Sequence, residues 1–286
     1  INGDGEFDLS VVTHAPNAVS IRMGDSRGGF GVNRRVDFGG QELRAAQYGD
    51  FNTDGRLDMV VTLSGGAGFS YHQGFGDGSF SQGAVIQALI GLGSVALGDV
   101  TGDGHLDVVG VSTTQGRLSI TRGTGNGLGA TNTLQLGRRF NEVHLADFDR
   151  DNDLDILAVG RDDFSHFVAY NDGVGRFPVT TQLSVFDGRD SIARTHAAIA
   201  DLNKDGYLDI AISNQSENVI YEFIANRLGS FGQVAIQPPL GLNPRPALSA
   251  TDVRALVSLD IDSDADADLM TVNGVDNHLE VFRNQC

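Results

Sequence analysis

A short acidic run recurs along the chain, and this repeat limits the possible folds more than any other feature. It occurs at residues 50–58 (DFNTDGRLD), 99–107 (DVTGDGHLD), 147–155 (DFDRDNDLD), 201–209 (DLNKDGYLD) and 260–268 (DIDSDADAD). A sixth copy, INGDGEFD, covers residues 1–8 and lacks the first aspartate. A repeat of about 50 residues is typical of propellers and other repeat arrays.

The sequence around each acidic run repeats as well. A short apolar run precedes it, a β-branched run such as Met59–Val61 follows it, and an alternating segment such as Leu118–Thr121 comes third. A glycine-rich turn with a phenylalanine comes next, and the phenylalanines are Phe30, Phe80, Phe177 and Phe231. The pattern of each repeat therefore predicts four short strands joined by tight turns, and helical periodicity is absent. We expect these phenylalanines to pack between neighbouring repeats.

One four-stranded sheet of this kind cannot bury both of its faces, so neighbouring sheets have to stack. The sequence therefore predicts an all-β fold, a β-propeller of four-stranded blades with six repeats visible and six or seven blades. We expect residues 1–286 to form a single propeller domain, with repeats starting near residues 1, 50, 99, 147, 201 and 260. A β-sandwich is the alternative, but it does not explain a regular period with the same acidic turn in every unit.

The spacing of oxygen-bearing side chains in the acidic runs predicts metal binding. In the run at 50–58, carboxylates or amides stand at positions 1, 3, 5 and 9, and Gly55 at position 6 allows a sharp turn. Ca²⁺ takes about 6–8 oxygen ligands and tolerates irregular cages better than Mg²⁺ does. Position 7 varies widely between copies, as expected for a residue that offers its backbone carbonyl. Asp, Asn and Gly are also good turn formers, but three or four clustered carboxylates repel one another without a cation.

We therefore expect about five or six Ca²⁺ ions. The candidate ligands are Asn2, Asp4, Glu6, Asp8, Asp50, Asn52, Asp54, Arg56, Asp58, Asp99, Thr101, Asp103, His105, Asp107, Asp147, Asp149, Asp151, Asp153, Asp155, Asp201, Asn203, Asp205, Tyr207, Asp209, Asp260, Asp262, Asp264, Asp266 and Asp268. The copies differ: Thr101 is a weaker donor at position 3, and Asn152 and Ala265 replace the position-6 glycine. An EF-hand is excluded because no copy has glutamate at position 12.

The run D-x-[DN]-x-D-G-x-x-D, followed by an apolar strand and then by G-x-F, resembles FG-GAP or VCBS-type repeats. These repeats form the integrin α-like, calcium-binding propeller. The resemblance extends over essentially the whole chain and implies a Ca²⁺ loop between the first and second strands of each blade. Members of the family are adhesion modules, fungal propeller lectins, and accessory domains of bacterial surface proteins and enzymes. The chain begins inside a loop and stops before a fourth strand, so we expect it to be a fragment of a longer protein.

Composition narrows the function classes. A net charge of -17 opposes nucleic-acid binding, no apolar run is long enough to span a membrane, and the lone Cys286 excludes a disulfide framework. No nucleophile motif is present, so we expect no catalytic residues and no enzymatic activity. His72, His166 and His278 are expected at the surface, whereas His144 and His196 are expected on inner strands.

The sequence thus predicts a calcium-stabilised recognition or adhesion module that is secreted or exposed on a cell surface. Its partner is expected to be a carbohydrate or a cell-surface protein, although Trp, the usual platform for sugar stacking, is absent. The alternative is a polysaccharide lyase or hydrolase on a propeller scaffold, or the accessory domain of such an enzyme. The oligomeric state is left open.

Overall fold

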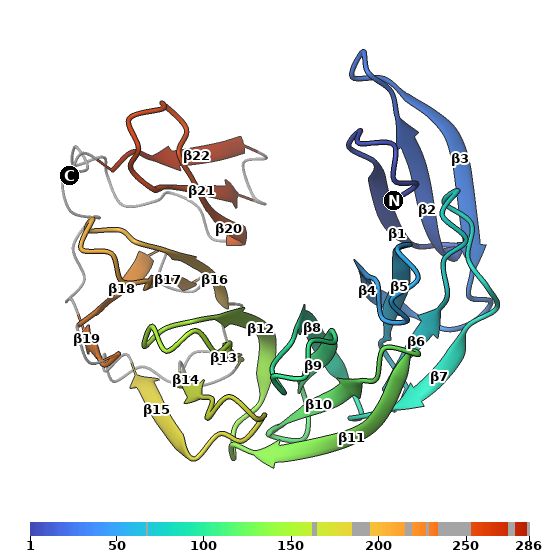
Figure 1. Ribbon diagram of the computed structural model, residues 1–286. Coiled ribbons are helices and arrows are strands. Elements are labelled where there is room, and N and C mark those ends of the chain that lie inside the picture. The colour runs from blue at the N-terminus through green and yellow to red at the C-terminus, as the bar shows by residue number, and fades with distance from the viewer. Residues whose placement is uncertain are drawn as a thin grey trace. The chain divides into compact units, whose positions relative to one another are not determined.

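The computed structural model describes residues 1–66, 68–161, 165–184, 195–214, 219–226, 229–233, 253–273 and 278–284. These residues form 22 strands (Figure 1) and contain no helix that is long and apolar enough to cross a membrane. The chain divides into two compact units, Ile1–Val143 and His144–Cys286. Cys286 lies outside the described residues.

The first unit contains three antiparallel sheets of consecutive strands. One sheet has β1 (Leu9–His14), β2 (Asn17–Gly24) and β3 (Phe30–Asp37). The next has β4 (Leu43–Gly49), β5 (Asp58–Leu63), β6 (Gly68–His72) and β7 (Ala84–Gln87). The third has β8 (Leu92–Gly98), β9 (Asp107–Ser112), β10 (Arg117–Gly123) and β11 (Leu128–Gln135).

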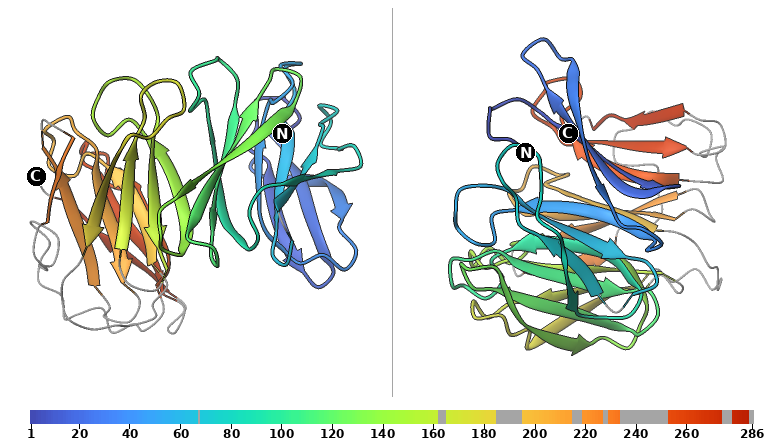
Figure 2. Two further views of the ribbon diagram at one scale, coloured as in Figure 1. Left: turned by 90° about the horizontal axis from the view of Figure 1, so that it is seen from below. Right: turned by 90° about the vertical axis from the view of Figure 1, so that its right-hand side faces the viewer.

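Three further sheets follow in chain order. The first has β12 (Phe140–Ala146), which runs across the boundary of the units, β13 (Asp155–Gly160), β14 (Ser165–Tyr170) and β15 (Val179–Ser184). The next has β16 (Thr195–Ala200), β17 (Asp209–Asn214), β18 (Val219–Ala225) and β19 (Phe231–Gln233). The last has β20 (Val253–Leu259), β21 (Asp268–Asn273) and β22 (His278–Phe282). Figure 2 shows the strands of each sheet lying side by side.

These sheets are the blades of the predicted all-β propeller, and the fold class is confirmed with six blades. The first and last sheets have three strands among the described residues, and the other four sheets have four. Each complete acidic run joins the first strand of a sheet to its second: residues 50–58 link β4 to β5, where Gly49 pairs with Asp58. The acidic loops therefore lie at one end of each sheet, and the hairpin turns between second and third strands lie at the other.

Burial explains why the sheets stack. In β5, β9, β13 and β17, the second strands of the four-stranded sheets, all six residues are buried. Their faces meet neighbouring sheets of the same unit: Val61 packs with Val19 and Ile21 of β2, and Val60 packs with Val95 of β8 and Val108 of β9. In the second unit, Leu157 of β13 shares a cluster with Ile212 of β17. Within each unit, neighbouring blades thus bury apolar residues against each other.

Two of the four phenylalanines of the glycine-rich turns pack as expected. The Phe80 ring lies 6.0 Å from Tyr48, and the Phe231 ring lies 5.7 Å from Phe148, measured between ring centroids. Phe30 differs, because 48% of it is exposed.

Candidate functional site

The acidic loops concentrate the backbone strain of the molecule. Among the described residues, every non-glycine with positive φ lies at position 4 or 6 of a loop: Thr53, Arg150, Asn152, Lys204, Ser263 and Ala265, with φ between 56° and 74°. Such a conformation costs on the order of 1–3 kcal/mol per residue and persists where the surroundings impose it. Asn152 and Ala265, which replace the glycine expected at position 6, both adopt the positive φ that glycine takes there. The strain at position 4 was not predicted, although Gly3 and Gly102 occupy that position in two copies.

The first carboxylate of each complete loop organises the turn. Asp50 accepts hydrogen bonds from the backbone N–H groups of Asp54 (3.1 Å) and Gly55 (2.8 Å). Asp54 in turn accepts the N–H of Arg56 at 2.9 Å. Positive φ at positions 4 and 6 folds the backbone around these acceptors, so the side chains of positions 1, 3 and 5 are brought together. The hydrogen bond from the position-6 N–H to the first carboxylate recurs at Asp99, Asp147, Asp201 and Asp260.

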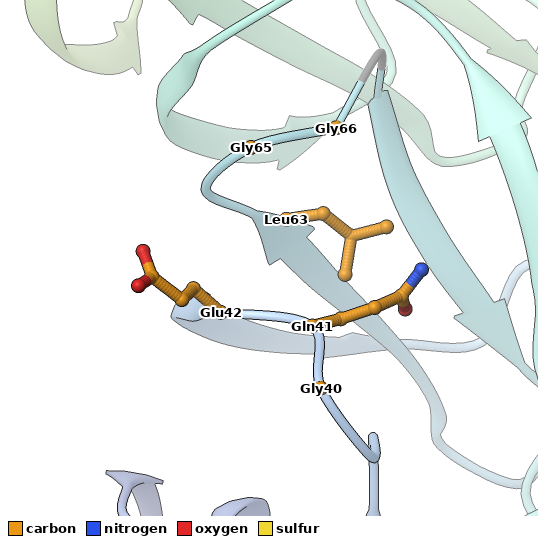
Figure 3. A pocket seen from close by; sticks show the side chains of 6 residues that line it. All are labelled: Gly40, Gln41, Glu42, Leu63, Gly65 and Gly66. Atoms are coloured by element: carbon orange, nitrogen blue, oxygen red, sulfur yellow. The ribbon is translucent and has the colours of Figure 1, made fainter.

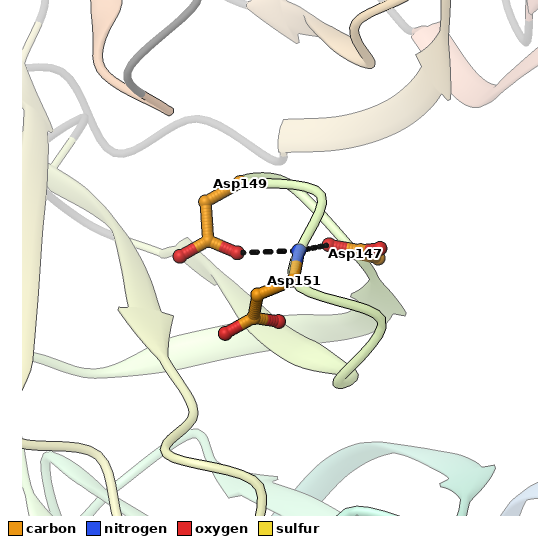
Figure 4. Close-up of side chains that lie close together, drawn as sticks. All are labelled: Asp147, Asp149 and Asp151. Atoms are coloured by element: carbon orange, nitrogen blue, oxygen red, sulfur yellow. Dashed lines mark hydrogen bonds between the residues drawn. The ribbon is translucent and has the colours of Figure 1, made fainter.

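Two loops gather three carboxylates each. The ligand oxygens of Asp147, Asp149 and Asp151 all lie within 4.8 Å of one another (Figure 4). The backbone N–H of Asp151 donates to both Asp147 (3.2 Å) and Asp149 (3.3 Å). The second group is Asp260, Asp262 and Asp268. Burial, together with the charges of Asp151 and Asp147, raises the pKa of Asp149. An all-oxygen donor set with this repulsion fits a hard divalent cation such as Ca²⁺.

The ninth-position aspartate has a structural role that the sequence analysis missed. Asp155 is fully buried, and its carboxylate accepts the N–H of Phe148 at 2.9 Å and the N–H of Asn171 at 2.8 Å. It therefore clamps the loop to the end of the third strand. Each clamp joins an aspartate to the residue 16 positions later, and the pairs are Asp8–Gly24, Asp58–Gly74, Asp107–Gly123, Asp155–Asn171, Asp209–Ala225 and Asp268–Asn284.

In three blades, a glycine 16 residues after the clamping aspartate indicates the clamp in the sequence. A Cβ atom at Gly24, Gly74 or Gly123 would lie 2.1, 2.0 or 2.2 Å from the carbonyl oxygen of the residue that precedes the clamping aspartate. Glycine permits this close backbone approach in three blades. The other three blades have Asn171, Ala225 and Asn284 at the same place, so the glycine spacing is incomplete.

Burial affects the acidity of two of the clamping aspartates. It raises the pKa of Asp155 and that of Asp209 to about 6 each, and the charges of neighbouring loop aspartates add to the rise. The two backbone hydrogen bonds at each carboxylate act in the opposite direction. A cation in the loop would favour the ionised form of both groups.

Position 7 was predicted to offer only its backbone carbonyl, yet its side chain makes specific contacts between adjacent loops. The guanidinium carbon of Arg150, at position 4, lies 5.0 Å from the ring centroid of Tyr207, at position 7 of the next loop. Lys204, at position 4 of that loop, forms an ion pair with the buried Asp266, at position 7 of the loop after it. In loops 147–155 and 201–209, the strained position 4 therefore directs a cationic side chain toward the following loop.

The first loop keeps the clamp of the other copies. Asp8 accepts hydrogen bonds from the nitrogen of Ile1 at 2.5 Å and from the backbone N–H of Gly24 at 2.9 Å. Burial acts to raise the pKa of Asp8, but the hydrogen bonds that its carboxylate accepts from Ile1 and from the backbone N–H groups of Gly24 and Asn2 together lower it. Asn2 and Asp4 are hydrogen-bonded to each other at 2.7 Å, and Glu6 is exposed.

The histidine predictions need correction. His72 and His166 were expected at the surface, but they are 5% and 0% exposed. His72 is held between Ser70 Oγ (2.9 Å from Nε2) and the carbonyl oxygen of Ser81 (3.0 Å from Nδ1). Both histidines lie on third strands, which face the packing between blades. His144 and His196 lie on the first strands β12 and β16, as expected, and the side chain of His278 lies outside the described residues.

Replacing His166 is expected to change the acid sensitivity of the protein. Burial lowers the pKa of His166 to about 3, and Nδ1 accepts the N–H of Gly160 at 3.1 Å. A histidine in the unfolded chain has a pKa of about 6.5, so below that pH the unfolded state binds a proton that the folded state does not. Stability is therefore fully present above this pH and falls by about 1.4 kcal/mol per pH unit as the pH decreases.

Urea denaturation between pH 7 and pH 5 measures this effect. His166→Asn keeps an acceptor for Gly160 but does not titrate, so its stability should fall less steeply than that of the wild type. Equal slopes for the two proteins would show that the buried ring does not govern acid sensitivity.

A hollow of ≈ 390 Å³ lies at the end of the second sheet opposite loop 50–58. Figure 3 shows the buried Leu63 between the Gly65–Gly66 turn and the Gln41 side chain, with Glu42 beside them. Sites for small ligands span roughly 300–1,000 Å³ and combine an apolar wall with a few polar groups.

In the third sheet the corresponding turn carries side chains that fill this place. Thr113 and Thr114 donate to the carbonyls of Gly91 and Ile90, and Gln115 accepts the N–H of Ile90 at 3.1 Å. The hollow therefore exists because the turn of the second sheet is Ser64-Gly65-Gly66, which has little side chain to occupy it.

Comparisons with solved structures agree with the fold. An Agrocybe aegerita lectin that recognises non-reducing terminal N-acetylglucosamine is 18% identical, with a TM-score of 0.61 over 98% of this chain and 81% of the lectin. BBS1N, solved in complex with ARL6DN, is 13% identical, with a TM-score of 0.62 over 98% of this chain and 76% of that one. A Bacteroides caccae protein of unknown function is 11% identical, with a TM-score of 0.52 over 94% of this chain and 83% of that one.

At these identities the solved structures share the fold alone, and no curated protein matched the sequence. Family models do match. The model described as FG-GAP-like repeat matches residues 50–110, 99–158 and 147–212, and the FG-GAP repeat model matches residues 193–236. Together these matches extend over more than half of the chain and contain four of its six acidic loops. The chain belongs to the FG-GAP repeat family.

Proposed function

We propose that the protein is a calcium-stabilised, non-catalytic recognition module that works outside the cell. The observation that carries this proposal is the strained backbone of four acidic loops, two of which bring three carboxylates close together. Strain of this kind is retained where function requires the geometry. Calcium concentrations of about a millimolar, as found outside cells, keep weak oxygen cages filled.

Within loop 147–155, Asp147, Asp149 and Asp151 would hold the ion. Calcium would supply positive charge that offsets the mutual repulsion of these carboxylates. The chain's own residues do the remaining work: Asp147 holds the turn through the N–H groups of Asp151 and Asn152. Asp155 fixes the loop to the third strand. About five or six loops of this kind would stiffen the blade ends.

The hollow at Gly65 and Gly66 is the place where we propose that a ligand is recognised. Gln41 offers an amide and Glu42 a carboxylate, both of which hydrogen-bond well to sugar hydroxyls, and Leu63 offers an apolar floor. These groups favour a carbohydrate over a protein partner, since the volume suits a small unit. The lectin that shares the fold recognises a sugar, which is consistent with this choice.

Filling the hollow should abolish ligand binding. Gly65→Thr introduces the residue that the third sheet has at the corresponding place, Thr114. A glycan array, probed in millimolar Ca²⁺ and again with EDTA, should show binding by the wild type that weakens with EDTA and decreases at least tenfold in the variant. Arg117→Gln, an exposed change on another strand, is the control and should bind normally.

Each other outcome of this experiment has a meaning. Binding that persists in Gly65→Thr would place the ligand elsewhere, and capture of a protein but no glycan would favour the protein partner. Release of unsaturated or reducing sugars from a bound glycan would replace the recognition role with a lyase or hydrolase role.

A further inference from the structure

In one acidic loop an arginine of the chain is hydrogen-bonded to the position-5 carboxylate. Arg122 Nε donates a hydrogen bond to Asp103 Oδ2 at 2.8 Å, and Asp103 is the position-5 candidate ligand of loop 99–107. The Asp103 side chain is 20% exposed, and that of Arg122 is 55% exposed. An arginine paired with a carboxylate in this way neutralises one of the charges that a metal ion would otherwise balance.

The position of Arg122 is set by the clamp of the same blade. Arg122 directly precedes Gly123, whose N–H donates to Asp107 at 2.7 Å. The loop and the arginine are therefore held by one hydrogen-bonded frame, which brings the guanidinium to the loop. The residues that occupy the corresponding place in the other sheets are Met23, Gln73, Tyr170, Ile224 and Arg283.

Among these residues, Arg283 is the other cation, and its contact is longer. Its Nη1 lies 3.7 Å from Asp262 Oδ2, beyond hydrogen-bond distance. Tyr170 donates its hydroxyl to the carbonyl of Gly229 instead of to its loop.

Loop 147–155 is the opposite case. Within the described part of the chain, no ion pair with lysine or arginine reaches Asp147, Asp149 or Asp151. The nearby Arg150 stacks on Tyr207 instead. This loop also has aspartate at position 3, where loop 99–107 has Thr101. The two loops therefore differ in the number of their carboxylates and in whether an arginine side chain balances one of them.

We propose that Arg122 takes the place of a divalent cation at loop 99–107, so that calcium occupies loop 147–155 and not loop 99–107. Arg122 is then a specificity-determining residue that decides which blade is loaded. The reason is electrostatic: an ion at Asp103 would meet a positive guanidinium bound to the same carboxylate. This inference rests on the proposed calcium binding and adds which loops take the ion.

Native mass spectrometry of the intact chain, titrated with CaCl₂, counts the bound ions. Arg122→Gln, which introduces the residue that the second sheet has at this place, should bind one ion more than the wild type. Arg117→Gln is the matched control: it removes the same charge from the same strand, but its partner is Gln135 and not a loop carboxylate. The control should bind the wild-type number.

Two further variants keep the inference testable if Arg122→Gln does not fold. Gln73→Arg places a guanidinium beside loop 50–58 and should remove one ion, and Asp151→Asn should remove one ion from loop 147–155. Circular dichroism verifies that each variant is folded.

The outcomes separate the two proposals. Equal counts for Arg122→Gln, Arg117→Gln and a calcium-binding wild type would overturn the role of Arg122 alone. Absence of calcium from every protein, the wild type included, would overturn the proposed function together with this inference.

Discussion

Replacing Asp155 with alanine is expected to lower the free energy of unfolding by about 2–6 kcal/mol, because two buried N–H groups would lose their acceptor at about 1–3 kcal/mol each. These groups belong to Phe148, within the loop, and Asn171, at the end of β14. Asp155 is fully buried, so water cannot replace the carboxylate easily. Urea denaturation followed by circular dichroism measures the change.

Two variants test whether the loss comes from the clamp. Asp155→Asn keeps one acceptor oxygen and should be intermediate. Asp37→Ala removes an exposed aspartate paired with Arg35 at 2.7 Å and should change stability by less than about 1 kcal/mol. If Asp155→Ala were as stable as Asp37→Ala, the clamp would not be a source of stability.

Removing calcium is expected to lower the melting temperature by about 10 °C or more. An ion that binds only the folded state adds about 2.7 kcal/mol per site when its free concentration is 100 times Kd. About 1 kcal/mol shifts the melting temperature of a domain of this size by roughly 2–4 °C, so two filled sites suffice. Differential scanning calorimetry in millimolar CaCl₂ and in EDTA measures the shift.

The matched control for this shift is a protein with one weakened loop. Asp149→Asn combined with Asp151→Asn removes two charges from loop 147–155, and its melting temperature should respond less to calcium than that of the wild type. Magnesium at the same concentration should replace calcium poorly, because it demands a regular octahedral site. A wild-type melting temperature that is the same in calcium and in EDTA would refute metal binding at the loops.

Much of the fold could be predicted because its determinants are local and repeated. The apolar run, the acidic turn and the alternating strand recur in order, so the sequence indicates both the blade and the place of the loop between its first two strands. Gly55 and its counterparts likewise indicate the turn at position 6. The clustering of Asp147, Asp149 and Asp151 agrees with the spacing of the candidate ligands. Whether these residues bind calcium stays a prediction.

The interactions between distant segments could not be predicted from the local sequence pattern. The clamp between Asp155 and Asn171 joins residues that meet only after two strands have paired, and glycine marks it in just three blades. His72 and His166 looked like surface residues because the turns beside them are polar, whereas the packing of blades buries both rings. The hollow beside Gly65 forms where the segment 40–42 and the Gly65–Gly66 turn come together in the fold.

The sequence by itself determined the repeat, the propeller fold and the candidate ligands, because strand alternation and turn chemistry act over a few residues. Only the tertiary structure decided how each loop is used. It turned the ninth aspartate into a clamp, brought Arg122 to Asp103, and directed Arg150 and Lys204 toward the following loops. These roles depend on charges and hydrogen-bonding groups that lie far apart in the chain and interact only when burial and strand pairing bring them within a few ångströms.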